Sequence, residues 1–179
     1  MKPGRWHGFT LAELLVSVAI LVVIAAVAIP LLSSQDPKKL EVAAAHIGGA
    51  LRFALGEANR SGGYVLVDAK STPGQLKAFF SDSAGNPGAA LVDPGTKRAL
   101  VIDTAGSAFS ANVGITPKFM RGGTAWAQLL IGPGGQLQAF DGPSNNKGTL
   151  QAGSGVVVAL GAQSLTVSVN EVTGFVTLP

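Results

Sequence analysis

Residues 9–32 read FTLAELLVSVAILVVIAAVAIPLL, an apolar run in which Glu13 is the one charged residue. As an α-helix this run would be about 36 Å long, at about 1.5 Å per residue. The hydrocarbon core of a membrane is about 30 Å thick, so the run is long enough to cross it. It is also longer than the apolar part of a secretory signal, about 7–15 residues, and no convincing cleavage site follows it. The sequence therefore predicts a helical anchor that stays on the protein.

Basic residues stand on both sides of this run. Lys2 and Arg5 precede it in the leader MKPGRWHG, residues 1–8, and Lys38-Lys39 follow it. The enrichment of Lys and Arg in cytoplasmic loops therefore leaves the orientation open. A short amino end is simpler to leave in the cytoplasm than the long remainder of the chain, so we expect the remainder to lie on the far side of the membrane.

A carboxylate in a membrane-spanning helix costs a few kcal/mol and usually marks function, although one this close to the helix start can also reach the headgroups. The residues around it, Gly8-Phe9-Thr10-Leu11-Ala12-Glu13, resemble the processing motif of type IV prepilins and type II secretion pseudopilins. The resemblance implies that a prepilin peptidase cuts after Gly8 on the cytoplasmic side. It also implies that the new terminal residue, Phe9, is N-methylated.

The same resemblance implies a filament subunit. Its partners would be other pilins or pseudopilins, the peptidase and an assembly platform in the bacterial inner membrane, with the carboxy-terminal domain in the periplasm. Glu13 would pair with the Phe9 amino group of a neighbouring subunit, because leaving either charge unpaired in apolar surroundings is expensive. Pro30 removes one helical hydrogen bond, so we expect a kink or local melting there. A proline near this place is usual in the family.

A second helix is predicted over residues 37–60. Asp36-Pro37 offers a cap and a first turn, and Ser61-Gly62-Gly63 ends the helix. Its apolar residues follow helical spacing, which predicts a face that packs on a sheet: Leu40, Ala44, Ile47, Leu51, Leu55 and Ala58. Gly48-Gly49 weakens the helix by roughly 1 kcal/mol per glycine, which close packing on the sheet or on a neighbouring helix would explain.

Short strands separated by turn residues are predicted from Tyr64 onward. They are Tyr64–Asp68, Leu76–Phe80, Ala99–Asp103, Asn112–Thr116, Ala125–Ile131, Gln136–Phe140, Gly155–Leu160, Leu165–Asn170 and Phe175–Leu178. Gly132–Gly135 and Asn170–Gly174 are expected hairpin turns, and Ser81–Gly95 and Asp141–Gly153 expected surface loops.

The predicted fold class is therefore α+β, a pilin-like lollipop. A long amino-terminal helix, transmembrane in its first half, packs on a carboxy-terminal antiparallel β-sheet domain. The predicted parts are a cleaved leader (1–8), a transmembrane and assembly helix (9–36), an amphipathic helix (37–60) and a globular β-rich domain (61–179).

Other chemistry finds little support in the sequence. The absence of cysteine excludes disulfides and thiolate sites. His7 lies in the leader, His46 has no ligand partner at suitable spacing, and no Ser/His/Asp set can be assembled. We therefore expect no enzyme, no cofactor and no metal, although the oxygen-rich loop Asp141–Gly148 leaves calcium open. We expect no nucleic-acid partner, since one would need a patch formed by the basic residues Lys97, Arg98, Lys118 and Arg121.

Residues 51–60, LRFALGEANR, followed by Gly-Gly-Tyr-Val-Leu-Val, resemble the helix end of the H-type minor pseudopilins and fimbrial T-type minor pilins. Leu51, Ala54, Glu57, Ala58 and Arg60 match that pattern, whereas Leu55 stands where an Arg is often found. The resemblance implies a minor pseudopilin of a type II secretion pseudopilus. The alternative is a minor type IV pilin that serves in pilus assembly, adhesion or DNA uptake.

Overall fold

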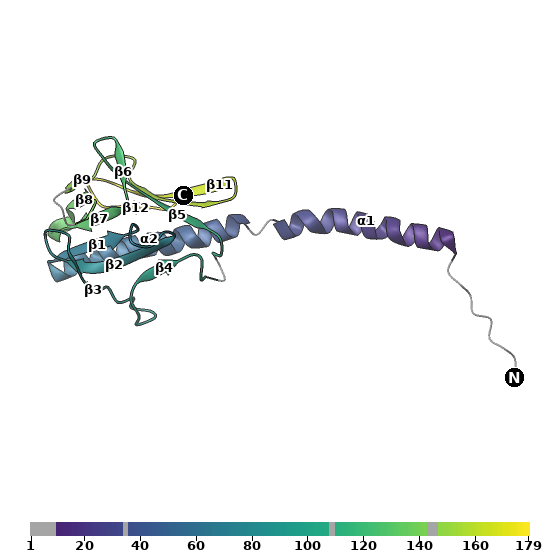
Figure 1. The fold of residues 1–179 in the computed structure, drawn as a ribbon, viewed down its shortest axis with the longest axis horizontal. Coiled ribbons are helices and arrows are strands. Elements are labelled where there is room, and N and C mark those ends of the chain that lie inside the picture. Colours follow the sequence, from purple (N-terminus) through teal and green to yellow (C-terminus); the bar gives the residue numbers. More distant parts are fainter. Residues whose placement is uncertain (1–9, 34–35, 108–109, 143–146) are drawn as a thin grey trace. The chain divides into compact units, whose positions relative to one another are not determined.

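The computed structural model describes residues 10–33, 36–107, 110–142 and 147–179, and for residues 27–33 and 36 it describes the backbone alone. The chain divides into two compact units, Met1–Asp36 and Pro37–Pro179. The first unit contains helix α1 (Leu11–Ser33), and helix α2 (Asp36–Ser61) opens the second (Figure 1). The remaining elements of the second unit are β1 (Tyr64–Asp68), β2 (Gln75–Ser81), β3 (Pro87–Ala90), β4 (Val101–Asp103), β5 (Gly114–Arg121), β6 (Thr124–Trp126), β7 (Gln128–Ile131), the 3₁₀ turn η1 (Pro133–Gly135), β8 (Leu137–Phe140), β9 (Lys147–Thr149), β10 (Gly155–Leu160), β11 (Gln163–Val169) and β12 (Val176–Thr177).

Helix α2 supplies one wall of the hydrophobic core. The predicted apolar stripe is buried, apart from Leu55, which is half-buried, and Ala43, Ala50 and Ala54 extend it. The polar residues Glu41, Arg52 and Arg60 of the helix are exposed. The helix ends at Ser61, and Gly62 follows with a φ of 64°, a left-handed conformation that glycine adopts without the penalty a Cβ brings.

The strands form two antiparallel sheets within the described residues. One has the order β3-β2-β1-β7-β8-β9, with β4 also paired to β2, and the other has the order β12-β11-β10-β5-β6. Both expected hairpin turns are present: η1 lies between the paired strands β7 and β8, and Asn170–Gly174 lies between β11 and β12. The prediction of an antiparallel α+β, pilin-like fold is confirmed.

Several details of the strand prediction were wrong. The predicted strand Asn112–Thr116 is β5, which begins at Gly114 and continues to Arg121. The predicted strand Ala125–Ile131 is two strands, because the chain leaves one sheet after Trp126 and joins the other at Gln128; between them the Ala127 carbonyl accepts a bond from the Ala69 amide. The expected loops 81–95 and 141–153 each contain a short edge strand, β3 and β9. Neither β3 nor β9 has a fully buried residue, so neither has the alternating apolar pattern by which strands are recognised.

The core lies between α2 and the two sheets. Alternate residues of a strand face opposite sides of a sheet, so Val65 and Val67 of β1 join the α2 side while Leu66 joins a smaller cluster on the other side with Leu130 and Phe140. The two helical glycines have different surroundings. A Cβ on Gly48 would lie 2.5 Å from Leu178 Cδ2, which explains that glycine by close packing, whereas Gly49 has no atom within 4 Å of the same position.

Candidate functional site

The start of α1 is closed by two side chains that bond to each other. The Thr10 amide and the Thr10 hydroxyl both donate to Glu13 Oε2, each at 3.1 Å, and the Glu13 amide donates to Thr10 Oγ1 at 3.2 Å. The first four amides of a helix have no partner within the helix. This reciprocal arrangement, a capping box, satisfies one of them and fixes where the helix begins. Ser17 donates its hydroxyl to the Glu13 carbonyl at 2.7 Å.

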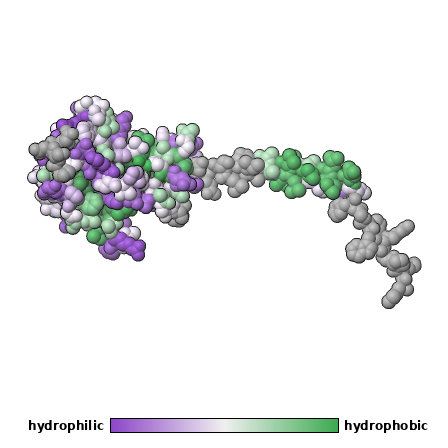
Figure 2. Space-filling model, viewed as in Figure 1, coloured by the Kyte–Doolittle hydropathy of each residue, from purple (hydrophilic) through white to green (hydrophobic). Residues whose placement is uncertain are grey.

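As far as Ala26, α1 exposes apolar side chains on every side. Their exposed fractions run from 50% at Val18 to 81% at Leu11, and Figure 2 colours the described surface of α1 almost wholly as hydrophobic, in contrast to the mixed surface of the globular unit. The set comprises Leu11, Leu14, Leu15, Val16, Val18, Ile20, Leu21, Val22, Val23 and Ile24. A helix that is apolar all round needs burial in a membrane or among other chains.

Among the described residues, no helix meets the combined length and apolarity required of a membrane span. The transmembrane assignment of residues 9–36 therefore stays a prediction from the sequence.

Of the other predicted site residues, the structure describes only the backbone of Pro30. Gly8 and Phe9, the predicted cleavage and methylation residues, lie outside the described residues. The helical backbone continues through Pro30 to Ser33. Of the two effects expected at Pro30, local melting is not present in this structure, and a kink stays a prediction. A proline in a helix removes only one hydrogen bond of the ladder, and here the residues on both sides of it stay helical.

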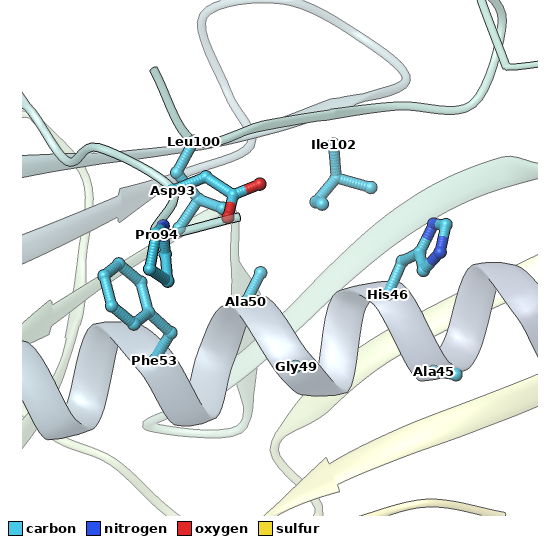
Figure 3. Close-up of a pocket in the computed structure, with 9 residues that line it drawn as sticks. All are labelled: Ala45, His46, Gly49, Ala50, Phe53, Asp93, Pro94, Leu100 and Ile102. Atoms are coloured by element: carbon cyan, nitrogen blue, oxygen red, sulfur yellow. The ribbon is translucent and has the colours of Figure 1, made fainter. Parts of the chain in front are cut away.

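A groove lies along the outer side of α2, beneath the connection between β3 and β4. It has a volume of about 340 Å³, and Figure 3 shows Phe53 and Pro94 side by side at one end and His46 at the other. The residues that line it are mainly apolar and include Ala50, Leu100 and Ile102. Among the described residues no three His, Asp or Glu side chains gather as metal ligands. The groove offers an apolar contact surface and has no constellation of groups suited to catalysis.

The carboxylate of the loop suggested for calcium is engaged by a lysine, and the lysine of that loop donates to a carbonyl outside it. Lys70 forms an ion pair with Asp141, and the Lys147 ammonium donates to the Ser83 carbonyl. Residues 143–146 of this loop lie outside the described residues. An ammonium group already neutralises the single carboxylate of the loop, so the described residues do not favour a divalent cation there.

The basic residues suggested for nucleic acid lie on separate elements. Lys118 and Arg121 are on β5 of the five-stranded sheet, whereas Lys97 and Arg98 belong to the turn between β3 and β4, beside the other sheet. The Arg121 guanidinium lies 5.6 Å from the centre of the Trp126 ring, and Lys97 lines a groove that also contains Glu57. Their placement gives no single basic surface with which to argue for nucleic acid.

A buried carboxylate ties together two loops at the edge of the globular unit. Asp68 Oδ1 accepts from the Lys70 amide at 2.8 Å and from Gln128 Nε2 at 3.0 Å, and Oδ2 accepts from the Ser71 hydroxyl. Gln128 in turn accepts from the Gly142 amide at 2.8 Å. Burial alone would raise the pKa of the Asp68 carboxyl, but these hydrogen bonds together lower its pKa below the ordinary value.

This network predicts loss of stability in acid. Because the folded chain binds the Asp68 proton more weakly than the unfolded chain, the stabilisation is complete above the unfolded pKa of about 3.9 and is lost as the pH falls through the lower folded pKa. Urea unfolding of the wild type and of Asp68→Asn between pH 5 and pH 3 tests this. We expect the variant to be about 1–3 kcal/mol less stable at pH 5 and to lose less further stability on acidification. Equal losses in the two proteins would contradict the assignment.

The local contact that the sequence analysis did not predict is the one between Thr10 and Glu13. A signal for it was present, since Thr10-x-x-Glu13 before an apolar run is the sequence signature of a capping box. As a lone charge in an apolar segment, Glu13 predicts a partner on a neighbouring subunit, whereas the bonds seen here lie within its own helix.

Comparison with known proteins agrees with the amino-terminal features. Residues 7–29 match the family model of the prokaryotic N-terminal methylation motif, which is the prepilin signal of type IV pilin-like proteins. The match does not distinguish the H-type subfamily. Neither a curated protein nor a solved structure matches the chain. The methylation motif, followed by a helix and an antiparallel α+β domain, supports placing the chain in the pilin and pseudopilin superfamily.

Proposed function

We propose that this chain is a minor pseudopilin, a structural subunit of a type II secretion pseudopilus that catalyses no reaction. The observation that carries the proposal is the position of α1. Most of a helix whose described apolar side chains are exposed on every side lies within the residues that match the methylation motif, 7–29. Such a helix has its lowest free energy in lipid before assembly and among the helices of other subunits afterwards.

In this proposal the amino-terminal parts act in sequence. The leader, residues 1–8, holds the junction at the cytoplasmic face of the bacterial inner membrane until a prepilin peptidase cuts after Gly8. Phe9 is then N-methylated, and residues 9–36 remain as a single-pass anchor with the globular domain in the periplasm. An inner-membrane platform passes the subunit into the filament, where Glu13 pairs with the amino terminus of a neighbouring subunit. Pro30 allows the helix to unwind locally during assembly.

Mass spectrometry of the native protein tests processing. We expect the mature chain to begin at an N-methylated Phe9, because Gly8 lets the backbone enter a narrow protease cleft and residues 9–32 carry no second cleavage signal. The variant Gly8→Val should accumulate with its leader attached, because a β-branched side chain restricts that backbone. The matched control, Gly4→Val, changes a leader glycine away from the junction and should be processed normally. Native protein that still begins at Met1, or that lacks residues 9–32, would overturn the proposal.

A minor type IV pilin is the alternative within the same superfamily, because the methylation motif is common to both classes. Neighbouring genes separate them: a secretion ATPase and secretin with other pseudopilins, or pilus motor genes. Salt-dependent DNA binding by residues 37–179 would favour a pilin that serves DNA uptake.

A further inference from the structure

Strand β11 has a neighbouring strand along only part of one side. It pairs with β10 from Gln163 to Ser168, but β12, on its other side, pairs only with Ser168 and Val169. Within the part of the chain that the structure describes, no strand lies beside Gln163–Val167 on that side. The β10–β11 hairpin extends toward the end of the second unit at which α2 begins (Figure 1). Residues 163–167 are therefore a free edge of the five-stranded sheet.

The backbone groups on this free edge belong to alternate residues of β11. The Val169 amide donates to the carbonyl of Ser154, which directly precedes β10. Successive residues of an antiparallel strand direct their N–H and C=O groups to opposite sides, so Ser164 and Thr166 face away from β10. Both residues are exposed. Each offers one donor and one acceptor to a strand placed beside β11.

This edge lacks the features that protect the other sheet edges of the described chain. Exposed edges are commonly blunted by proline, charged side chains, bulges or short length. Strand β3 begins with Pro87 and pairs with β2 through a shift of register, and β5 carries Pro117 where β6 does not reach it. Strands β4, β6, β9 and β12 have three residues or fewer. Strand β11 has seven residues, none of them charged or proline, and its register with β10 is regular, so its edge is suited to pairing.

A separate groove lies between this edge and the first turns of α2, with a volume of about 330 Å³. The helix and the strand each contribute three of its lining residues: Pro37, Leu40, Glu41, Gln163, Ser164 and Leu165. Leu40 is buried and Leu165 is half-buried, which gives the groove apolar walls. Glu41 is exposed and is the one charged residue among the described residues of the lining. An occupant of the groove therefore meets apolar groups and a carboxylate.

We propose that this groove binds an extended segment of a partner protein, which adds a strand to β11 and places a Lys or Arg side chain beside Glu41. The free bonding groups on the edge belong to the backbone, and an extended peptide is the ligand whose own backbone matches them. The aliphatic part of a Lys or Arg side chain would pack against Leu40 and Leu165 while its charged end reaches the carboxylate. A second copy of this chain fits less well, because β11 itself carries no basic residue. The inference goes beyond the pseudopilin role and does not depend on it.

Amide hydrogen exchange of the full chain in detergent micelles tests strand addition. The probe is the peptide acetyl-Thr-Val-Thr-Lys-Thr-Val-Thr-amide at up to about 5 mM, which detects weak binding, and the matched peptide has Glu in place of Lys. The Lys peptide should slow exchange at Ser164 and Thr166 at least about threefold, the factor expected when its concentration is about twice the dissociation constant. Exchange at Leu165, whose amide faces β10, should change much less. The Glu peptide should bind at least about fivefold more weakly, because its carboxylate lies beside Glu41.

Three variants separate strand addition from other kinds of binding. Ser164→Pro removes the amide that faces the free side and leaves the bonds to β10 in place, so it should abolish the slowing at Thr166. The matched variant Ser164→Ala keeps that amide and should bind the Lys peptide like the wild type. Glu41→Gln keeps the strand edge but carries no charge, so it should bind the Lys and Glu peptides within about twofold of each other.

Four results would overturn the proposal. The first is no slowing by the Lys peptide, and the second is equal slowing by the two peptides in the wild type. The third is slowing that survives in Ser164→Pro, or a preference for the Lys peptide that survives in Glu41→Gln, because binding would then not use the strand edge or the carboxylate. The fourth is exchange at Ser164 that slows as the protein concentration rises without peptide, together with a dimer in sedimentation, which would assign the edge to a second copy.

Discussion

Replacing Glu13 with valine is expected to leave cleavage after Gly8 intact and to lower incorporation into the filament at least about a hundredfold. Removing one partner of a charge pair in apolar surroundings costs about 3–5 kcal/mol, because the other charge is left without compensation. Each 1.4 kcal/mol corresponds to about a factor of ten. The valine side chain would leave the amino group of the neighbouring subunit without its carboxylate, while the apolar helix itself would insert at least as well as before.

Three controls separate the charge from its side effects. Val16→Ala changes an exposed apolar residue of the same helix and should be processed and incorporated. Glu13→Gln keeps an oxygen for the two Thr10 donors and can complete the capping box, but it carries no charge. We therefore expect Glu13→Gln to be impaired and Thr10→Ser to behave like the wild type. Cleavage is measured by the mass of the amino terminus and incorporation by cross-linking. Normal incorporation of Glu13→Val would refute the register role of Glu13.

The sequence predicted the fold well where burial is regular. In α2 the spacing of Leu40, Ile47 and Leu51 identified the face that packs on the sheets, and all three are fully buried. Strands β1 and β10 begin and end at the predicted residues, because each is bounded by turn residues and contains β-branched valines, two in β1 and three in β10.

The sequence could not reveal features that depend on the pairing of distant segments. The edge strands β3 and β9 are held by hydrogen bonds to β2 and β8, and their own residues are mostly exposed. The network of Asp68 joins residues that are 60 positions apart, Asp68 and Gln128. At the candidate assembly site the opposite holds: the bonds between Thr10 and Glu13 are local, and their spacing alone indicates them.

The largest loss of stability is expected from adding a single methyl group at Gly155. This residue begins β10 and lies opposite Ser168 of β11. A Cβ there would lie 2.2 Å from the Val167 carbonyl oxygen and 3.0 Å from the Ser168 Cα. Both are backbone atoms of a strand that is paired on both sides, so neither can move without breaking the hydrogen bonds of the five-stranded sheet. We expect Gly155→Ala to cost at least about 3 kcal/mol, at the upper end of the range for overpacked sites.

Gly49→Ala is the matched control, because its effect should have the opposite sign. Gly49 is an exposed glycine inside α2 with no atom within 4 Å of the added Cβ, so alanine should stabilise the chain by about 0.5–1 kcal/mol.

Both variants can be unfolded in urea in the full-length processed chain and followed by the fluorescence of Trp126, the one tryptophan left when the leader with Trp6 is removed. Trp126 packs against the core, so its emission reports on the loss of the globular fold. If Gly155→Ala unfolds at the same urea concentration as the wild type, β10 does not approach the Val167 carbonyl as closely as the structure places it. If both substitutions move the urea midpoint of unfolding in the same direction, the space around each glycine does not determine the effect of the added methyl group.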